Sequence, residues 1–153
     1  MPLIILEDSR QKSEKNAHIR EQLNNLGCTV NRCKLYVGDY VLANNQAISI
    51  DTKQDMTEVE GNLTTQHKRF REECERASEA GIKLIILVVD NDIKRLEDVF
   101  AWKNPRRFYS KKCVTGRTLA KIMYSMRDKY GVEWEFCTKD KIGERILELL
   151  EVE

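Results

Sequence analysis

Hydrophobic residues follow two kinds of pattern along this chain, continuous runs and helical repeats. Residues 3–8 and 82–90 contain unbroken apolar runs, which are typical of strands buried on both faces of a sheet. Strands are also expected within residues 28–36 and 133–137, and helical spacing predicts helices over residues 13–26, 54–77, 93–100, 116–130 and 140–150. The sequence therefore predicts an α/β fold in which helices flank a mixed central β-sheet.

A β-hairpin is predicted within residues 38–53. Polar and apolar residues alternate in the second half of this stretch, so Asp51 and Lys53 share one face of a strand. Residues 37–42 alternate in the same way and form the second, shorter strand. Asn44-Asn45 between them has the composition of a turn.

The register of this hairpin decides whether its acids meet. A two-residue turn at Asn44 and Asn45 places Asp39 opposite Ile50 and on the wrong face. A three-residue loop or a single bulge moves the pairing by one residue, which exchanges the faces and places Asp39 opposite Asp51. We predict the second register.

Two carboxylates and one ammonium group would then share a pocket. Paired aspartate oxygens are hard ligands of the kind that Mg²⁺ prefers, and the bound ion keeps several waters. We expect Asp39 and Asp51 to bind Mg²⁺ or Mn²⁺, and Lys53 to orient a water and balance charge in phosphoryl transfer. The alternative is that these side chains are paired charges on the exposed face of an edge hairpin.

The composition is that of one domain over residues 1–153, because a chain of this length with 41% hydrophobic residues can form a single core. The 26 basic and 25 acidic residues nearly cancel, so a surface for DNA must come from local segregation of charge. Five cysteines without a Cys-x-x-Cys pair, and only two histidines, argue against a zinc site and favour a reducing compartment. Without a signal peptide or a membrane-spanning run, we expect a soluble, cytoplasmic protein.

A basic cluster lies between residues 103 and 112, where five basic residues accompany two aromatic ones. The side chains of this cluster that we expect to contact DNA are Arg106, Arg107, Lys111 and Lys112. Phe108 or Tyr109 could stack on an unpaired base. The alternative is a solvated surface loop.

Further polar side chains stand where an active site is expected. Asp8 ends the first buried strand and Arg10 follows it, and open α/β sheets place their sites at the carboxyl ends of strands. The alternative for both is a solvated turn. Gln66 falls on the apolar stripe of the long helix, which indicates either a functional amide or a buried amide bonded to backbone.

These residues form a series that resembles a known family. Gly38-Asp39-Tyr40, an apolar strand and then Asp51-Thr52-Lys53 resemble the Gly-Asp and Glu-Arg-Lys signature of the XPF/Mus-type structure-specific endonucleases, a branch of the PD-(D/E)XK nuclease superfamily. Asp8-Ser9-Arg10-Gln11 resembles the opening Asp-x-Arg-Glu motif, and Gln66-His67-Lys68-Arg69 resembles a Gln-x-x-Arg region. The likeness covers most of residues 3–150, and the hairpin is its most specific part.

The resemblance implies a restriction-endonuclease-like sandwich and a Mg²⁺- or Mn²⁺-dependent endodeoxyribonuclease that acts on branched or forked DNA. The implied metal ligands are Asp39, Asp51 and the carbonyl of Thr52, and the other implied catalytic residues are Lys53, Asp8, Glu58 and Gln66. The implied DNA contacts outside the basic cluster are Arg10, Lys68 and Arg69.

The sequence departs from the family pattern at three positions. Gln11 replaces an acid, Thr52 replaces an arginine, and Thr57 stands where an acid is expected four residues after the signature lysine. Glu58 is the nearest replacement, although it can also cap a helix with Asp55. These departures support an alternative function, a non-catalytic DNA-binding or dimer-partner module with a degenerate nuclease fold. A restriction-type or junction-resolving nuclease of the same superfamily would share the fold and metal site.

Relatives of this kind pair through their C-terminal helices, so the resemblance implies a homodimer through residues 116–130 and 140–150. The alternative is that these helices only cover the sheet. Such relatives commonly carry a tandem helix-hairpin-helix module after the nuclease domain, whereas this chain ends at Glu153. We therefore expect a free-standing nuclease domain of the kind found in phage or mobile-element genomes, acting in a bacterial or phage-infected cell, and a separate DNA-recognition partner could assist it.

Overall fold

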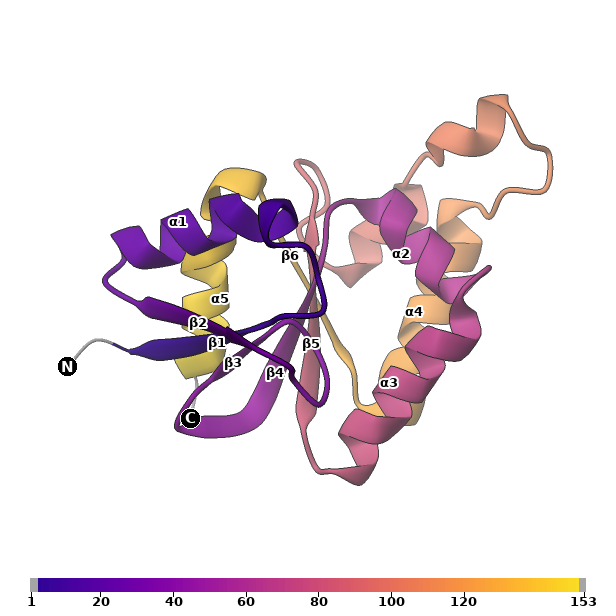
Figure 1. Ribbon diagram of the computed structural model, residues 1–153. Helices are drawn as coiled ribbons and strands as arrows, with labels where there is room; N and C mark the ends of the chain where they lie inside the picture. Colours follow the sequence, from indigo (N-terminus) through magenta and orange to yellow (C-terminus); the bar gives the residue numbers. More distant parts are fainter. Residues whose placement is uncertain (1–2, 152–153) are drawn as a thin grey trace.

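A six-stranded mixed β-sheet with the strand order β2-β1-β3-β4-β5-β6 runs through the molecule (Figure 1). The computed structural model describes residues 3–151. The strands are β1 (Ile4–Asp8), β2 (Thr29–Cys33), β3 (Tyr40–Leu42), β4 (Asn45–Lys53), β5 (Lys83–Val89) and β6 (Glu133–Cys137). β1 runs parallel to β2 and antiparallel to β3, β3 and β4 are antiparallel, and β4, β5 and β6 are parallel. The prediction of a mixed sheet is confirmed.

Helices cover both faces of this sheet. The α-helices are α1 (Ala17–Asn25), α2 (Met56–Leu63), α3 (His67–Glu79), α4 (Gly116–Tyr130) and α5 (Ile142–Glu151). Short 3-10 turns are η1 (Ser13–Asn16), η2 (Leu96–Ala101), η3 (Pro105–Phe108) and η4 (Lys139–Lys141). Figure 1 shows α1 and α5 on one side of the sheet and α2, α3 and α4 on the other. In the part of the chain that the structure describes, no helix is long and apolar enough to cross a membrane.

The two faces of the sheet carry separate hydrophobic cores because neighbouring strand residues point to opposite faces. Along β5, Ile85 and Leu87 pack with the α1–α5 layer, and Ile86 and Val88 pack with the α2–α4 layer. Burial of one such side chain stabilises the fold by about 1.5 to 3 kcal/mol. Because Ile50 of β4 belongs to the α1–α5 core, its neighbours along the strand face the α2–α4 layer.

The hairpin has the register that brings its acids together. Tyr40 pairs with Ile50, and Leu42 pairs with Asn45, so extra residues of β4 are accommodated between the two pairs. Such an irregularity shifts the register and exchanges the faces of the strand. The pairing at Tyr40 is the one that sets Asp39 against Asp51, as predicted. The turn itself lies one residue earlier than expected, between β3 and β4.

The long helix predicted over residues 54–77 is two helices, α2 and α3. At the junction, the hydroxyls of Thr64 and Thr65 donate to backbone carbonyls one turn earlier, at 2.7 and 3.2 Å. Such side-chain bonds offer the backbone an alternative to the helical ladder. Gln66 is therefore the residue before α3, with an exposed side chain, and the expectation that it faces the core is wrong.

Candidate active site

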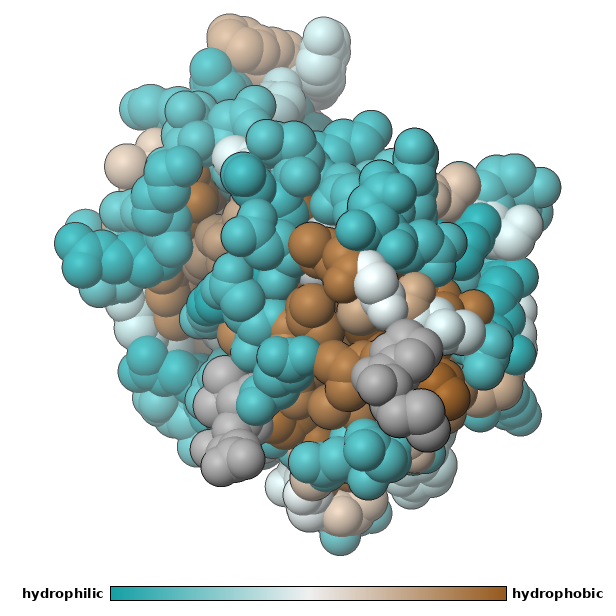
Figure 2. All heavy atoms as spheres, turned by 90° about the vertical axis from the view of Figure 1, so that its left-hand side faces the viewer, coloured by the Kyte–Doolittle hydropathy of each residue, from teal (hydrophilic) through white to brown (hydrophobic). Residues whose placement is uncertain are grey.

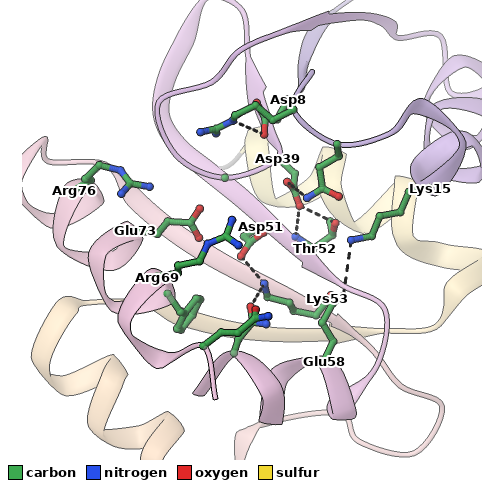
Figure 3. Close-up of a pocket in the computed structure, with 16 residues that line it drawn as sticks. Asp8, Lys15, Asp39, Asp51, Thr52, Lys53, Glu58, Arg69, Glu73 and Arg76 are labelled. Atoms are coloured by element: carbon green, nitrogen blue, oxygen red, sulfur yellow. Dashed lines mark hydrogen bonds and ion pairs between the residues drawn. The ribbon is translucent and has the colours of Figure 1, made fainter. Parts of the chain in front are cut away.

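Side chains of β1, β4, α2 and α3 and of the loop before β3 line one pocket (Figure 3). Its acidic residues are Asp8, Asp39, Asp51, Glu58 and Glu73, and its basic residues are Arg10, Lys15, Lys53, Arg69 and Arg76. The acids of the strands and of the loop before β3 are buried, whereas Arg10, Lys15 and Arg69 are exposed. An acidic floor with a basic rim suits a cation and the phosphates of a polyanion together.

Asp39 and Asp51 form the floor of the pocket, with exposed fractions of 3% and 5%. The backbone N–H and the hydroxyl of Thr52 donate to Oδ2 of Asp39 at 2.9 and 3.0 Å, and Nε2 of Gln11 donates to Oδ1 at 3.0 Å. Burial and the nearby charge of Asp51 raise the pKa of Asp39 well above its ordinary value. A cation bound between the two side chains would relieve the unfavourable effect of the Asp51 charge on Asp39.

Gly38 allows the loop before β3 to close against β4. Its φ of +74° lies in the left-handed region, and a Cβ there would stand 2.1 Å from Oγ of Ser49. The next residue, Asp39, donates its N–H to the carbonyl of Ile50 at 2.7 Å. Glycine is therefore required here for the aspartate to reach the pocket floor.

Lys53 is a buried ammonium group beside Asp51. Its Nζ lies 3.0 Å from Oδ2 of Asp51, donates to Oδ1 of Asn62 at 2.6 Å and sits 5.5 Å from the ring centre of Phe70. Burial alone would lower the pKa of Lys53, but the charge of Asp51 and its neighbours outweighs this effect and raises the pKa. The side chain is therefore a fixed positive charge at neutral pH.

Glu73 of α3 is a site residue that the sequence analysis missed. Its carboxyl group points toward Asp51 inside the pocket (Figure 3). Burial and the charge of Asp51 raise the pKa of Glu73 to about 7. A sequence signal exists, because Arg69, Glu73 and Arg76 follow one another at spacings of four and three on one face of α3, beside its apolar stripe.

Asp8 and Arg10 hold the loop that leads to Asp39. Nε of Arg10 lies 3.0 Å from both carboxylate oxygens of Asp8, and Nη2 donates to the carbonyl of Leu35 at 2.9 Å. Asp8 accepts the N–H of Leu35 at 3.1 Å, and its own N–H donates to the carbonyl of Asp39 at 2.8 Å. Both residues line the pocket, and their described contacts position its floor.

The remaining predicted residues lie at the rim or outside the pocket. Glu58 lines the pocket, accepts the N–H of Gln54 at 3.2 Å and lies 3.8 Å from Lys15. Gln66 and Arg69 are exposed and line the pocket, whereas Lys68 is exposed outside it. The basic cluster does not line the pocket either: Arg106, Arg107, Lys111 and Lys112 lie on a segment of their own.

The donor set of the floor fits a hydrated divalent cation. Within residues 3–151, no three His, Cys, Asp or Glu side chains are gathered closely enough to hold a metal ion by themselves. Mg²⁺ needs only one or two carboxylates, because it keeps several of its waters. Asp39 and Asp51, side by side and opposed by one lysine, meet this requirement.

Comparison with known proteins agrees with this geometry. The sequence model described as ERCC4 domain matches residues 8–147, which is most of the chain. The chain belongs to the ERCC4 domain family. A comparison of this ERCC4 domain with curated proteins gives no match.

Two solved structures share the fold of this ERCC4 domain, XPF from Aeropyrum pernix and the same protein in complex with DNA. Both have a TM-score of 0.69 and a sequence identity of 20%, and the matches cover 96% and 97% of this chain. The chain spans 63% of the length of each XPF chain. The predicted restriction-endonuclease-like α/β sandwich and the resemblance to the XPF type are thereby confirmed.

Proposed function

We propose that this ERCC4 domain is a divalent-metal-dependent endonuclease that hydrolyses phosphodiester bonds in branched or forked DNA. Family membership supports the nuclease class, and one of the two similar XPF structures is a complex with DNA. The observation that carries the proposal is the arrangement of the pocket floor. Two buried carboxyl groups, Asp39 and Asp51, lie close to each other, and the ammonium group of Lys53 pairs with Asp51. We propose Mg²⁺ or Mn²⁺ as the cofactor.

Asp39 and Asp51 would hold the ion, and the carbonyl of Thr52 stays a predicted third ligand. When bound, a divalent cation polarises the phosphoryl oxygens and makes a bound water more acidic. The chain's own contribution is a preorganised, largely buried electrostatic environment. The ammonium group of Lys53 stabilises the negative charge that develops on the phosphoryl group. Glu73, which lies beside Asp51 in the pocket, would help to hold the carboxylate of Asp51 in place.

The basic rim would hold the DNA strand around the scissile bond. Arg69 and Arg76 extend from the same face of α3, and Lys15 approaches from the opposite side of the pocket (Figure 3). Arg10 also lines the pocket. Contacts from arginine and lysine to phosphates position the DNA without reading its sequence. This arrangement favours recognition of DNA shape over base sequence.

The proposal is tested by cleavage of supercoiled plasmid and of labelled forks with Mg²⁺ or Mn²⁺. We expect Asp39→Asn, Asp51→Asn and Lys53→Ala each to lower the cleavage rate by at least about a hundredfold, because each removes charge that acts on the reacting phosphate. Asp128→Asn, at an exposed position of α4, serves as a matched control and should cleave normally. Full activity in all three site variants would refute the mechanism.

A binding module without catalysis is the second candidate. Thr57, which stands where the family pattern has an acid, is exposed and does not line the pocket, and Gln11 supplies an amide to Asp39 in place of an acid. Such a module would bind DNA and leave plasmid and fork intact with either metal. Incision mapping on forks, flaps and four-way junctions separates the two candidates and identifies the substrate.

A further inference from the structure

The basic cluster forms an arm, defined here as residues 103–115, that projects from the body of the molecule. It connects η2 to α4 and contains the short turn η3. Figure 1 shows this orange segment extending outward beyond α2 and α4, away from the sheet. A protruding loop of this length whose ends are held together is a type of segment that frequently carries function.

The two ends of the arm are held together tightly. A Cβ on Gly116 would stand 2.5 Å from the carbonyl oxygen of Trp102 and 2.6 Å from that of Val99, so the backbone at one end packs directly on the other. Asn104 is buried and donates from Nδ2 to the carbonyl of Val114 at 2.8 Å. The arm is therefore anchored at its base while its tip extends into solvent.

A buried acid fastens the arm to the active-site helix. Glu60 of α2 accepts from Nδ2 of Asn104 and, at 2.5 Å, from Nη1 of Arg106. Glu58 and Asn62, two residues to either side of Glu60 on the same helix, line the pocket. The base of the arm is thus separated from the pocket by the thickness of one helix, about 10 to 12 Å.

The tip of the arm presents bare aromatic rings among positive charges. Phe108 and Tyr109 are 75% and 89% exposed, and the guanidinium group of Arg107 lies 4.3 Å from the ring centre of Phe108. The arm has five basic residues and no acidic one. Of these five, only Arg106 has an acidic partner among the ion pairs of residues 3–151. Both the rings and most of the charges are free to meet a ligand.

We propose that this arm binds the unpaired nucleotides of the DNA substrate next to the incision site, with Phe108 and Tyr109 stacking on bases and the basic residues contacting phosphates. Stacking on an exposed ring suits any base but requires a base that is not paired. The high positive charge of the arm complements a phosphate backbone. The proposal rests on the proposed nuclease function and deepens it, because it assigns the contact with unpaired nucleotides to a segment outside the active-site pocket.

The test is a binding measurement in which no cleavage occurs. Fluorescence anisotropy in EDTA compares two labelled DNAs, a fork with unpaired arms and a fully paired duplex of equal length. We expect the wild type to prefer the fork, and Phe108→Ala/Tyr109→Ala to bind the fork at least about fivefold more weakly while binding the duplex unchanged. Both rings are exposed, so circular dichroism should show an unchanged fold.

Two further variants separate stacking from charge. Phe108→Trp/Tyr109→Trp retains aromatic faces and should retain the preference for the fork. Lys111→Ala/Lys112→Ala removes two charges without removing a ring, and should weaken binding to both DNAs and reduce the dependence of affinity on salt. A 2-aminopurine base in the unpaired arm should change its fluorescence on binding the wild type and not the double alanine variant.

Equal binding of both DNAs by the wild type, or an unchanged preference in the double alanine variant, would overturn the role of the arm. Cleavage assays with Mg²⁺ keep this outcome separate from the nuclease proposal. If the double alanine variant keeps the wild-type preference for the fork and still cleaves it, the arm proposal is wrong and the nuclease proposal stands. If binding of the fork depends on the two rings but no DNA is cleaved, the arm proposal stands and the nuclease proposal is wrong.

Discussion

Asp39 and Asp51 approach each other because one residue of register in a hairpin decides which face each of them occupies. The alternation of β4 placed Asp51 and Lys53 on one face from the sequence alone. Glu73 could not be assigned in the same way, because a charged residue beside an apolar helical stripe also fits a solvated position. At the residue scale, the central trio was predictable and its neighbour on α3 was not.

The first prediction at this scale concerns metal binding. Mg²⁺ or Mn²⁺ should raise the melting temperature of the protein, because an ion that binds only the native state stabilises it, by about 2.7 kcal/mol at a concentration a hundredfold above Kd. Asp51→Asn should lose most of this shift, whereas Asp128→Asn should keep it. Differential scanning fluorimetry measures both. An equal shift in wild type and Asp51→Asn would show that the ion binds elsewhere.

A second prediction concerns pH and Glu73. The raised pKa, about 7 in the folded protein, means that the native state holds a proton that the unfolded chain releases near pH 4.5. Without metal, this contribution to stability is fully present below pH 4.5 and is lost as the pH rises through 7. We expect the free energy of unfolding in EDTA to fall from pH 5 to pH 8 by less in Glu73→Gln than in the wild type. Urea titrations at both pH values measure it, and identical falls would contradict the assignment.

At the scale of elements, the site depends on a loop, a strand and two helices that meet around one pocket. The loop before β3 is closed by Gly38 and tied to β1 by Asp8 and Arg10. The break between α2 and α3 lets Asn62 and Glu73 line the same pocket from two helices. In the sequence, Thr64 and Thr65 are two ordinary polar residues, so the hydrogen bonds of their hydroxyls at that break could not be predicted.

Gly38→Ala should therefore damage both stability and metal binding. The positive φ strains any larger residue, and the added Cβ would collide with Ser49, so we expect a loss of about 1 to 3 kcal/mol. Gly27→Ala is the matched control, because Gly27 has a φ of +87° but nothing within 4 Å of a Cβ. Chemical unfolding and a Mg²⁺ titration compare the two variants. A loss no greater at Gly38 than at Gly27 would show that the loop can relax.

At the scale of the whole molecule, the last two helices lie on opposite faces of the sheet. Leu119 and Met123 of α4 pack in one core, and Ile142 and Ile146 of α5 pack in the other. Figure 2, which faces the side of the molecule that carries α1 and α5, shows hydrophobic side chains gathered at the surface. The helices therefore cover the sheet, and a dimer must use residues that this packing leaves accessible.

We propose that the chain nevertheless forms a homodimer, since hydrophobic surface of this kind marks interaction sites. Gel filtration with light scattering at micromolar concentration should give twice the mass of 17.9 kDa. A strict monomer at that concentration would contradict pairing. Because the pocket is built within one chain, metal-dependent stabilisation should not depend on protein concentration.

The sequence by itself determined the α/β class, the hairpin and the shared face of Asp51 and Lys53, because strand and helix periods are local properties of the chain. Only the tertiary structure decided that Glu73 reaches Asp51 and that Glu60 anchors the arm. Both contacts join residues far apart in sequence, and they depend on how α2 and α3 pack against the sheet and the arm. A hydrophobic period predicts which face of a helix is buried. Which polar residues at the border of that face make contacts depends on the packing of the folded chain.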